Sequence, residues 1–481
     1  MFSYIGALSN VLGGCLLLPL AAAAFGPLRP IDLVAFTLPA VVMACVGLLL
    51  HVTCRQKQPP PMGTPEAAFI VTVVWMLATV AGGAPFVIGG ILSPIDATFE
   101  AMSGWTTTGL TMVQPEAIPA IYNLWRSVMQ FLGGAGLAVI MLTAIVGSIG
   151  PGVYAAEART EHLVPHVRHT ARWIFRIYIA YLAIGVGLYL IVGMPIFDSI
   201  CHAMCALATG GFSVKNANIG AYNSLPIELV SVVLMIIGCV SFATHHTLII
   251  HRGRKGWRDA ELILMFWLLL LSIPIVARGL ALGGPVPGPL GLRESLFHTV
   301  SALTGTGFST RDLNLSLSGG DMVIFSLTIL MLIEGGTGST AGGIKQFRVA
   351  IILRSIWWWI KKQFYPTSAV IQRTIWRRGD RLEVRDRQLL AVVGFVGLYL
   401  LTYMAGVGVL LMDGYHLKES MFEYASAIGT IGLSVGLTSP QMHTPSKVAC
   451  ILGMWLGRLE FIAVFHAFIK VARDVAQRKG R

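Results

Sequence analysis

The stretch SGWTTTGLT, from Ser103 to Thr111, sets three adjacent hydroxyl side chains and a glycine between two long apolar segments. Its surroundings recur, without gaps, when four segments are aligned on one glycine. Each copy has a carboxylate thirteen residues before the glycine, a polar residue one helical turn after the carboxylate, and a Thr or Ser two residues after the glycine. The copies are Asp96–Gly109, Asp198–Gly211, Glu294–Gly307 and Glu419–Gly432. This recurrence indicates one structural unit used four times.

The composition is that of a membrane protein. Of 481 residues, 55% are hydrophobic and only 12% are charged, which is too little charge to cover a water-soluble protein of this length. Several apolar runs reach about 20 residues, the length at which a helix crosses a bilayer. No Ser-His-Asp arrangement, HExxH or dinucleotide-binding motif occurs, so no enzyme activity is expected. Nucleic-acid binding is not needed to explain the basic net charge.

The apolar runs predict an all-α polytopic membrane protein with four pseudo-symmetric repeats around one pore, preceded by a two-helix hairpin. Each repeat consists of a span, a half-helix, a glycine-bearing stretch and a second span. The predicted units are the hairpin (1–58), repeat one (59–155), repeat two (156–256), repeat three with a broken inner helix (257–362), and a basic linker with repeat four (363–481). The half-helices are expected near 94–105, 196–207, 292–303 and 417–428, too short to span a bilayer.

The distribution of basic residues predicts the orientation. Ten spans place both termini on one side of the membrane, and 26 of the 35 Lys and Arg residues fall in segments on that side. The positive-inside rule therefore predicts cytoplasmic termini and glycine stretches that enter from outside. The largest basic segment is 345–387, with Trp357–Trp359 inside it. Contact with anionic lipid is the simpler interpretation of this segment, and docking of a cytoplasmic partner is the more specific one.

The glycine-bearing stretches predict a filter for a dehydrated cation. Irregular backbone is tolerated within a membrane where it lines a watery path, and four such stretches can present carbonyl oxygens in place of a hydration shell. None of the four contains a carboxylate, which favours a monovalent ion over calcium. The predicted filter residues are Thr106, Thr107, Thr108, Gly109, Ala208, Thr209, Gly210, Gly211, Thr304, Gly305, Thr306, Gly307, Gly429, Thr430, Ile431 and Gly432.

Polar residues precede each filter at fixed spacing. The carboxylates Asp96, Asp198, Glu294 and Glu419 are expected in the first turn of each half-helix, where helix capping explains them better than attraction of cations does. The residues one turn later are Glu100, His202, His298 and Glu423, and the two histidines are expected to pack behind the filter rather than to sense pH.

The second span of repeat three is interrupted by EGGTGSTAGGIK, from Glu334 to Lys345. Five glycines and three hydroxyl residues predict a break in the helix, and irregular backbone at this depth indicates that the break lines the ion path. A phosphate-binding loop fits this segment poorly, because the Gly-Lys-Ser/Thr ending is absent and no βα context exists. Arg458 lies inside the last span, where a charge is a candidate functional residue. The structural alternative for Arg458 is a buried salt bridge with Glu460 or Glu334.

The chain resembles the Trk/Ktr/HKT superfamily of potassium transporters over nearly its whole length. FEAMSGWTTTGLT, CALATGGFS, SALTGTGFST and SAIGTIGLSVGLT are similar to the four filter segments of that family. RSVMQFLGGAGLAVI, EGGTGSTAGGIK and GMWLGRLEF are similar to its inner-helix motifs. The N-terminal hairpin resembles the bacterial TrkH type, while the fourth filter is more like the Ktr type.

The resemblance implies potassium uptake across the bacterial inner membrane. In the family, glycine at the key filter position of all four repeats accompanies potassium selectivity, and a serine in the first repeat accompanies sodium permeation. The resemblance also implies a gate below the filter, made by an intramembrane loop and an arginine. These residues are Gly335, Gly336, Thr337, Gly338, Ser339, Thr340, Ala341, Gly342, Gly343, Lys345 and Arg458.

The implied partners are a second copy of the chain, membrane lipid and a cytoplasmic nucleotide-binding regulatory subunit of the TrkA type. This chain shows no nucleotide site, so no cofactor is expected and potassium is the substrate. Two alternatives stay open from sequence. One is a sodium-permeable or potassium–sodium coupled transporter of the same family. The other is a membrane scaffold or receptor subunit that conducts no ion, which would leave the repeated filters unexplained.

Overall fold

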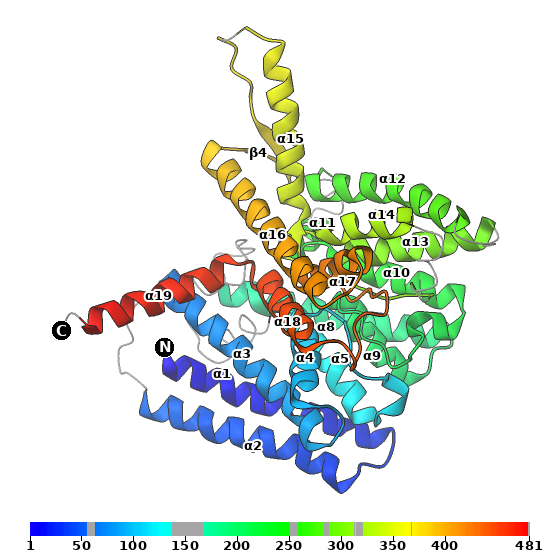
Figure 1. Cartoon of the computed structure of the whole chain (residues 1–481), viewed down its shortest axis with the longest axis vertical. Helices are drawn as coiled ribbons and strands as arrows, with labels where there is room; N and C mark the ends of the chain where they lie inside the picture. The colour runs from blue at the N-terminus through cyan, green and yellow to red at the C-terminus, as the bar shows by residue number, and fades with distance from the viewer. Residues whose placement is uncertain are drawn as a thin grey trace.

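The computed structural model describes residues 1–54, 63–136, 167–250, 258–282, 288–311, 313, 321–366 and 368–479. Within these ranges the chain is helical apart from two small two-stranded sheets (Figure 1). Six of the described helices are long and apolar enough to cross a membrane, or up to eight spans if each of two sharply bent pairs counts as one. The prediction of a multi-pass all-α membrane protein is confirmed.

The N-terminal hairpin is formed by α1 (Phe2–Cys15), the 3-10 helix η1 (Leu18–Ala24) and α2 (Pro30–Thr53). Glycines let α1 and α2 pack closely, since a Cβ at Gly6 would lie 2.6 Å from the carbonyl oxygen of Gly47. The buried Asp32 caps the start of α2 and accepts a hydrogen bond from the Tyr122 hydroxyl at 2.9 Å. This contact attaches the hairpin to repeat one.

Each repeat begins with an outer helix and continues into a half-helix, as predicted. The outer helices are α3 (Thr64–Ile88), α8 (Val167–Ile191), α12 (Ala260–Leu282) and α16 (Asp386–Met412). The half-helices are α4 (Pro94–Trp105), α9 (Ile196–Leu207), α13 (Gly288–Thr304) and α17 (Leu417–Gly429), and short 3-10 turns η2 (Pro115–Ala117) and η3 (Asn218–Tyr222) follow in repeats one and two. The C-terminal ends of the half-helices are buried, so the glycine stretches begin inside the protein.

The inner helices are interrupted in the three repeats where their continuation is described. In repeat two, α10 (Leu225–Cys239) meets α11 (Phe242–Ile250) at 100°, and in repeat four α18 (Thr444–Leu459) meets α19 (Ile462–Lys479) at 97°. Glu460 and Phe461 both have positive φ, which ends the right-handed helix. In repeat one the inner helix α5 runs over Ala120–Gly134, and the rest of the predicted span 120–148 lies outside the described residues.

The inner helix of repeat three is broken at the predicted place. The helix α14 (Asp321–Leu332) ends, and α15 (Gln346–Gln363) begins only after the glycine-rich loop. The two ends of the loop are joined by a parallel pair of very short strands, β1 (Ile333–Glu334) and β2 (Ile344–Lys345). The pairing of β1 with β2 therefore brings the two ends of the loop together.

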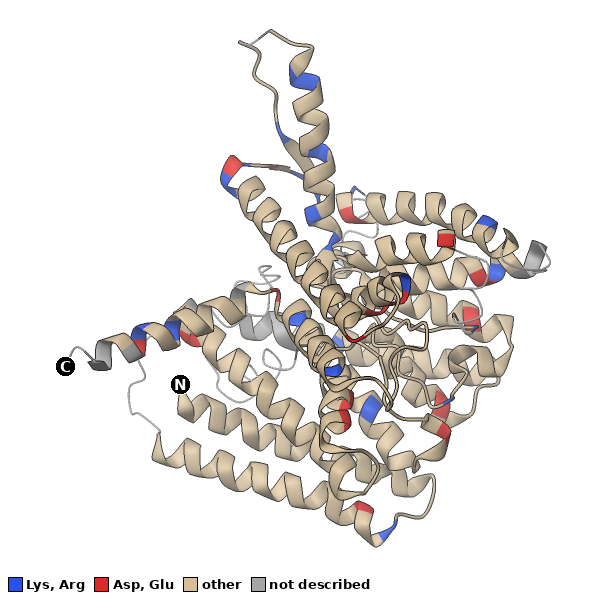
Figure 2. Ribbon diagram, viewed as in Figure 1, with Lys and Arg blue, Asp and Glu red and all other residues tan. Residues whose placement is uncertain are grey.

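An arm that the sequence did not predict extends from the helical body (Figure 1). It consists of α15 and an antiparallel hairpin of β3 (Thr374–Arg377) and β4 (Asp380–Glu383). The hairpin turn places Arg378 and Gly379 at positive φ, the conformation of a two-residue turn that matches strand twist. Lys and Arg residues are spread along the arm (Figure 2).

Candidate functional site

The four glycine stretches form a closed ring. The glycines on which the four copies align, Gly109, Gly211, Gly307 and Gly432, are called the key glycines. A Cβ added at Gly109 would overlap the carbonyl oxygen of Gly210, the residue before the key glycine of repeat two. The same contact recurs from Gly211 to Thr306, from Gly307 to Ile431, and from Gly432 back to Thr108. Each key glycine therefore packs against the next repeat, and repeat four returns to repeat one. No side chain larger than glycine fits at these four positions without displacing backbone.

The backbone conformation repeats with the same register. The key glycines have φ of +92°, +76°, +81° and +103° in chain order, which favours glycine. Two residues before them, Thr107, Thr209, Gly305 and Thr430 also have positive φ. In all four stretches the amide of that residue bonds to the carbonyl five positions before the key glycine, and the next amide bonds to the carbonyl six positions before it. The predicted fourfold repeat is thus present at the level of single hydrogen bonds.

A further repeated position was missed in the sequence. It lies six residues before the key glycine and holds Ser103, Cys205, Ser301 and Ser426. Ser103 and Ser426 accept hydrogen bonds at 3.0 Å from the amides of Gly109 and Gly432. Ser301 donates at 2.7 Å to the carbonyl of Phe308. These hydroxyls hold the backbone at the key glycine. The recurrence of Ser or Cys at this position in the aligned copies could have predicted their role.

Repeat two has Cys205 at this position, and another side chain replaces the missing hydroxyl. Gln130 of α5 donates to the carbonyl of Gly210 and accepts from the amide of Phe212 at 3.1 Å. Gln130 is fully buried. A side chain of repeat one therefore sets the backbone of the glycine stretch in repeat two.

The polar residues one turn into each half-helix tie down the chain that follows the glycine. Glu100 accepts from the Thr111 hydroxyl at 2.9 Å and from the Met112 amide at 2.7 Å. Glu423 accepts from Ser434 at 2.8 Å. His202 and His298 make the corresponding contacts in repeats two and three, with Ser213 at 2.9 Å and the Thr310 amide at 3.4 Å. They lie behind the stretches, as predicted.

The first acidic residue of each copy does not play one uniform role. Asp96, Asp198 and Glu419 lie in the first turn of their half-helices, as expected. Glu294 does not, because α13 begins at Gly288, and the prediction for repeat three is wrong on this point. Glu294 instead pairs with Arg311 at 3.3 Å.

Arg126 is a buried charge whose role the sequence did not indicate. Its guanidinium pairs with Glu100 at 2.7 Å and donates to the carbonyl of Ser213 at 2.9 Å. It also lies over the ring of Phe212, 4.1 Å from the centroid. Arg126 thus joins the segments that follow the glycines of repeats one and two.

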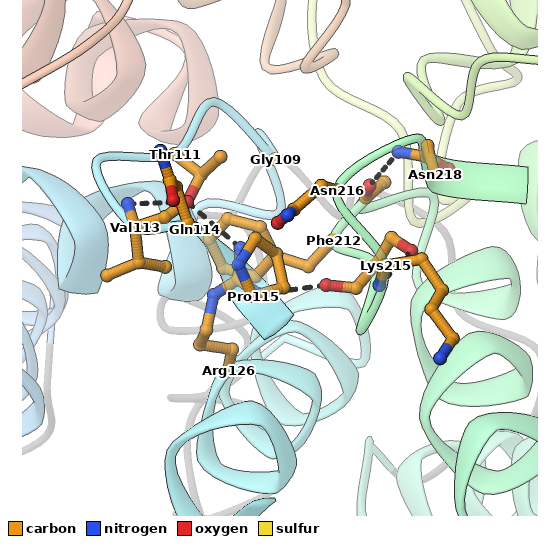
Figure 3. A pocket seen from close by; sticks show the side chains of 12 residues that line it. Gly109, Thr111, Val113, Gln114, Pro115, Arg126, Phe212, Lys215, Asn216 and Asn218 are labelled. Carbon is orange, nitrogen blue, oxygen red and sulfur yellow. Dashed lines mark hydrogen bonds between the residues drawn. The ribbon is translucent and has the colours of Figure 1, made fainter. Parts of the chain in front are cut away.

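Two adjoining cavities open above the ring. One, of about 300 Å³, is lined by Gly109, Gly211 and Arg126 (Figure 3). The other, of about 670 Å³, is lined by Gly307 and Gly432. Both include Asn216 and Asn218, which lie close together in Figure 3. All four key glycines therefore face polar cavities on the side from which the half-helices enter.

The loop of repeat three packs against the opposite side of the ring. Thr340 donates to the carbonyls of Leu207 at 3.1 Å and Gly238 at 2.9 Å, at the end of α9 and on α10. Its hydroxyl also lies 3.1 Å from that of Thr209. A Cβ at Gly342 would lie 2.7 Å from the carbonyl oxygen of Gly429. The loop thus contacts the inner ends of the stretches in repeats two and four.

The other loop residues and Arg458 complete this layer. The amide of Gly336 bonds to Cys239 at 2.9 Å, and that of Thr337 bonds to Glu261 at 2.8 Å. Lys345 donates to the carbonyl of Ala341, within the loop itself. Arg458 donates to the carbonyls of Thr340 and, at 2.8 Å, of Gly133. Arg458 therefore connects the loop to α5, while Glu460 pairs with Arg348.

Comparison with known proteins agrees with this architecture. The TrkH family, described as cation transport proteins, matches residues 33–278 and 285–477. The chain belongs to the TrkH family. An uncharacterized cation transporter of Methanocaldococcus jannaschii, MJ1485, is 30% identical over 438 residues, covering 90% of this chain and 88% of the relative.

Other TrkH family relatives have more specific names. The Trk system potassium uptake protein TrkH of Halomonas elongata is 28% identical, over 90% of this chain and 91% of its own length. The crystal structure of the potassium transporter TrkH from Vibrio parahaemolyticus superposes with a TM-score of 0.82 at 25% identity, over 96% of this chain and 97% of that one. The TrkH family assignment confirms the resemblance seen in the sequence. The family consists of transporters, so the protein is not an enzyme.

Proposed function

We propose that this TrkH family member conducts potassium ions into the cell through the ring of glycine stretches. The observation that carries the proposal is the cyclic contact of Gly109, Gly211, Gly307 and Gly432, each packed on a carbonyl of the next repeat. The relatives named as potassium uptake proteins support potassium as the ion. Four backbone stretches around one path supply carbonyl oxygens that can replace the water shell of a dehydrated ion.

The chemistry of the ring favours a monovalent ion. Glu100 and Glu423, the buried carboxylates one turn into the half-helices of repeats one and four, accept hydrogen bonds from the chain that follows the glycine. Their charge is thereby used to hold backbone rather than to coordinate an ion. A site built from neutral carbonyls binds weakly enough to release the ion again, as conduction requires. The resemblance to the family implies potassium rather than sodium, because position 109 holds glycine and not serine.

The loop Gly335–Gly343, with Lys345 and Arg458, is proposed as the gate. Thr340 and Gly342 of the loop lie against the inner ends of the stretches, so an ion leaving the ring inward meets the loop. Five glycines allow the loop to change its backbone conformation at low cost. Arg458, which holds Thr340, adds a positive charge that opposes a cation until the loop moves.

The remaining assignments follow from the basic segments and from the resemblance. We infer a location in the bacterial inner membrane with both termini cytoplasmic, and the repeat boundaries 1–58, 59–155, 156–256, 257–362 and 363–481. A homodimer and a TrkA-type regulatory subunit are the proposed partners. The arm around α15 is the proposed docking surface for the regulator, because it carries the largest group of Lys and Arg residues.

Ion flux into liposomes tests the function directly. Purified protein reconstituted into potassium-loaded vesicles is expected to carry potassium and rubidium several-fold faster than sodium, in keeping with relatives that are named potassium uptake proteins. Equal sodium and potassium rates would favour the sodium-permeable alternative. No flux of any alkali ion, with and without the regulator, would favour the non-conducting scaffold and overturn the proposal.

A further inference from the structure

Glu334 occupies a position directly beside two of the glycine stretches. A Cβ at Gly305 would lie 2.7 Å from Oε2 of Glu334, and a Cβ at Gly429 would lie 2.5 Å from Oε1. Gly305 belongs to repeat three and Gly429 to repeat four. The carboxylate therefore lies at the junction of these repeats, on the inner side where the loop packs.

The carboxylate of Glu334 is buried and lacks hydrogen-bond partners. The residue is fully inaccessible to solvent, and neither oxygen accepts a hydrogen bond of normal geometry within the described part of the chain. The amide of Gly342 interacts with the Glu334 carboxylate but does not form a hydrogen bond of normal geometry with it. Lys345 and Arg458 are close enough to act on its charge, and they donate hydrogen bonds to the loop carbonyls of Ala341 and Thr340. A buried carboxylate without direct ligands is costly unless a cation or proton compensates it.

A hydroxyl at the same junction is also unsatisfied. Thr430 corresponds to Thr107 and Thr209, which have the same left-handed backbone. The hydroxyls of those two donate to the preceding carbonyls, Thr106 at 2.6 Å and Ala208 at 2.7 Å. The Thr430 hydroxyl has no hydrogen-bond partner among the described residues, although its backbone is equivalent. Of the three threonines at this position, only Thr430, which lies beside Glu334 at the junction with the loop, departs from the pattern.

These oxygens converge on the loop. A Cβ at Gly342 would overlap the Thr430 hydroxyl and lie 2.7 Å from the Gly429 carbonyl oxygen, and a Cβ at Gly343 would lie 2.8 Å from the carboxyl carbon of Glu334. A carboxylate, a hydroxyl and a carbonyl thus surround the same two loop glycines. Oxygen donors of these three kinds are the ligands that hard alkali cations take.

We propose that Glu334, Thr430 and the carbonyl of Gly429 form a second monovalent cation site, on the inner side of the ring and separate from the four-carbonyl filter. The inference deepens the proposed function, since the cation would be the transported potassium ion on its way past the loop. Glu334 supplies a negative charge beside the inner ends of the stretches and offsets the positive charge of Lys345 and Arg458. An ion held there bridges repeat four to the loop, so occupancy of the site also stabilises the loop position.

Potassium binding can be measured apart from transport. The midpoint of thermal unfolding of the purified full chain is recorded against potassium concentration, for the wild type, Glu334→Gln and Thr430→Val. Both substitutions keep side-chain volume while removing an ion ligand. In each variant, the potassium concentration that gives half of the maximal thermal shift is expected to rise about tenfold. This factor corresponds to the loss of one charge-assisted contact to the ion. The double variant should be little worse than Glu334→Gln alone, because ligands of one ion are coupled.

A matched control separates ion binding from loss of charge. Glu228→Gln removes a buried carboxylate that pairs with Arg293 at 2.6 Å on α10, and it should leave potassium dependence at the wild-type level. A wild-type potassium dependence in Glu334→Gln, or strictly additive effects in the double variant, overturns the second site. Absence of flux in wild-type liposomes would instead overturn the proposed function, while the thermal measurement would still decide the site.

Discussion

Lys447 of the last repeat forms a buried ion pair with Asp96 of the first, with 2.5 Å between Nζ and Oδ1. The side chains are only 5% and 11% exposed. Lys447 also donates to the carbonyl of Pro440 at 2.8 Å, and Asp96 accepts from the Ser93 hydroxyl at 2.6 Å. The pair joins the two ends of the fourfold array, so it closes the ring at the level of side chains.

Breaking this pair is expected to destabilise the protein. Lys447→Met leaves Asp96 buried without its cation and should lower the free energy of unfolding by about 3 kcal/mol. The double variant Lys447→Met/Asp96→Asn should recover part of that loss, since no charge is then stranded. Chemical denaturation in detergent measures both. Lys418 and Asp321 make a matched exposed pair, and Lys418→Met should cost at most about 1 kcal/mol. Equal losses in the two variants would contradict a closing role for Lys447.

Replacing a key glycine should weaken ion selectivity. Gly109→Ser introduces a Cβ onto the carbonyl of Gly210 at a φ of +92°, so the backbone of two repeats must shift. The ratio of potassium to sodium permeability should fall by about tenfold, the factor that corresponds to 1.4 kcal/mol. Flux in liposomes under bi-ionic conditions measures the ratio. Gly187→Ser on α8 is the control, since a Cβ there meets nothing within 4 Å. An unchanged ratio in Gly109→Ser would refute the filter assignment.

The sequence predicted the outer helices, the half-helices and the recurring glycines because each depends on a pattern that repeats along the chain. It did not predict the sharp bends of the inner helices in repeats two and four. The key glycines share a register that any alignment of the chain on itself reveals. Gln130 and Arg126 escaped prediction for the opposite reason, since each acts on the glycine stretch or the following segment of a neighbouring repeat. Which repeats adjoin is settled only by the tertiary structure.

The partners of buried charged residues were likewise not predictable from the sequence alone. The sequence offered Glu460 or Glu334 as a partner for Arg458. Glu460 pairs with Arg348 instead, while Arg458 donates to the carbonyls of Thr340 and Gly133 and lies close enough to Glu334 to act on its charge. The hairpin Thr374–Glu383 was missed because its strands are only four residues long and carry several charged residues, so no extended apolar alternation marks them.

Loss of the Gln130 contacts should disturb repeat two alone. Gln130→Leu removes the donor to the carbonyl of Gly210 and the acceptor for the amide of Phe212, and leaves two buried backbone groups unsatisfied. The expected cost is about 2 kcal/mol of stability together with reduced potassium selectivity. Denaturation and bi-ionic flux measure the two effects. Gln363→Leu, at the exposed end of α15, should change neither. A fully selective Gln130→Leu protein would show that Gly210 is held by its neighbours.

Weakening the hold on the loop should raise flux without the regulator. Thr340→Val removes the hydroxyl bonds to Leu207 and Gly238, and Arg458→Ala removes the guanidinium that holds the Thr340 carbonyl. Each variant should increase basal potassium flux about tenfold, as expected for a loss of 1.4 kcal/mol in the closed state. Thr402→Val on α16, which loses only a bond to its own helix, is the control. Basal flux that stays the same or falls in both folded variants would exclude the loop as the gate.

Docking of a cytoplasmic regulator on the arm can be separated from lipid contact by charge removal. Lys361 and Lys362 are exposed at the end of α15, and Lys361→Ala/Lys362→Ala should weaken regulator binding about fivefold, as two exposed ion pairs of about 0.5 kcal/mol each imply. The difference from wild type should shrink at high salt, because exposed charges are screened. Binding is measured in nanodiscs without anionic lipid. Lys418→Ala lies in repeat four outside the arm and should bind like wild type. Undiminished binding by the double variant would leave anionic lipid as the partner of these two lysines, which nanodiscs of graded phosphatidylserine content would then measure.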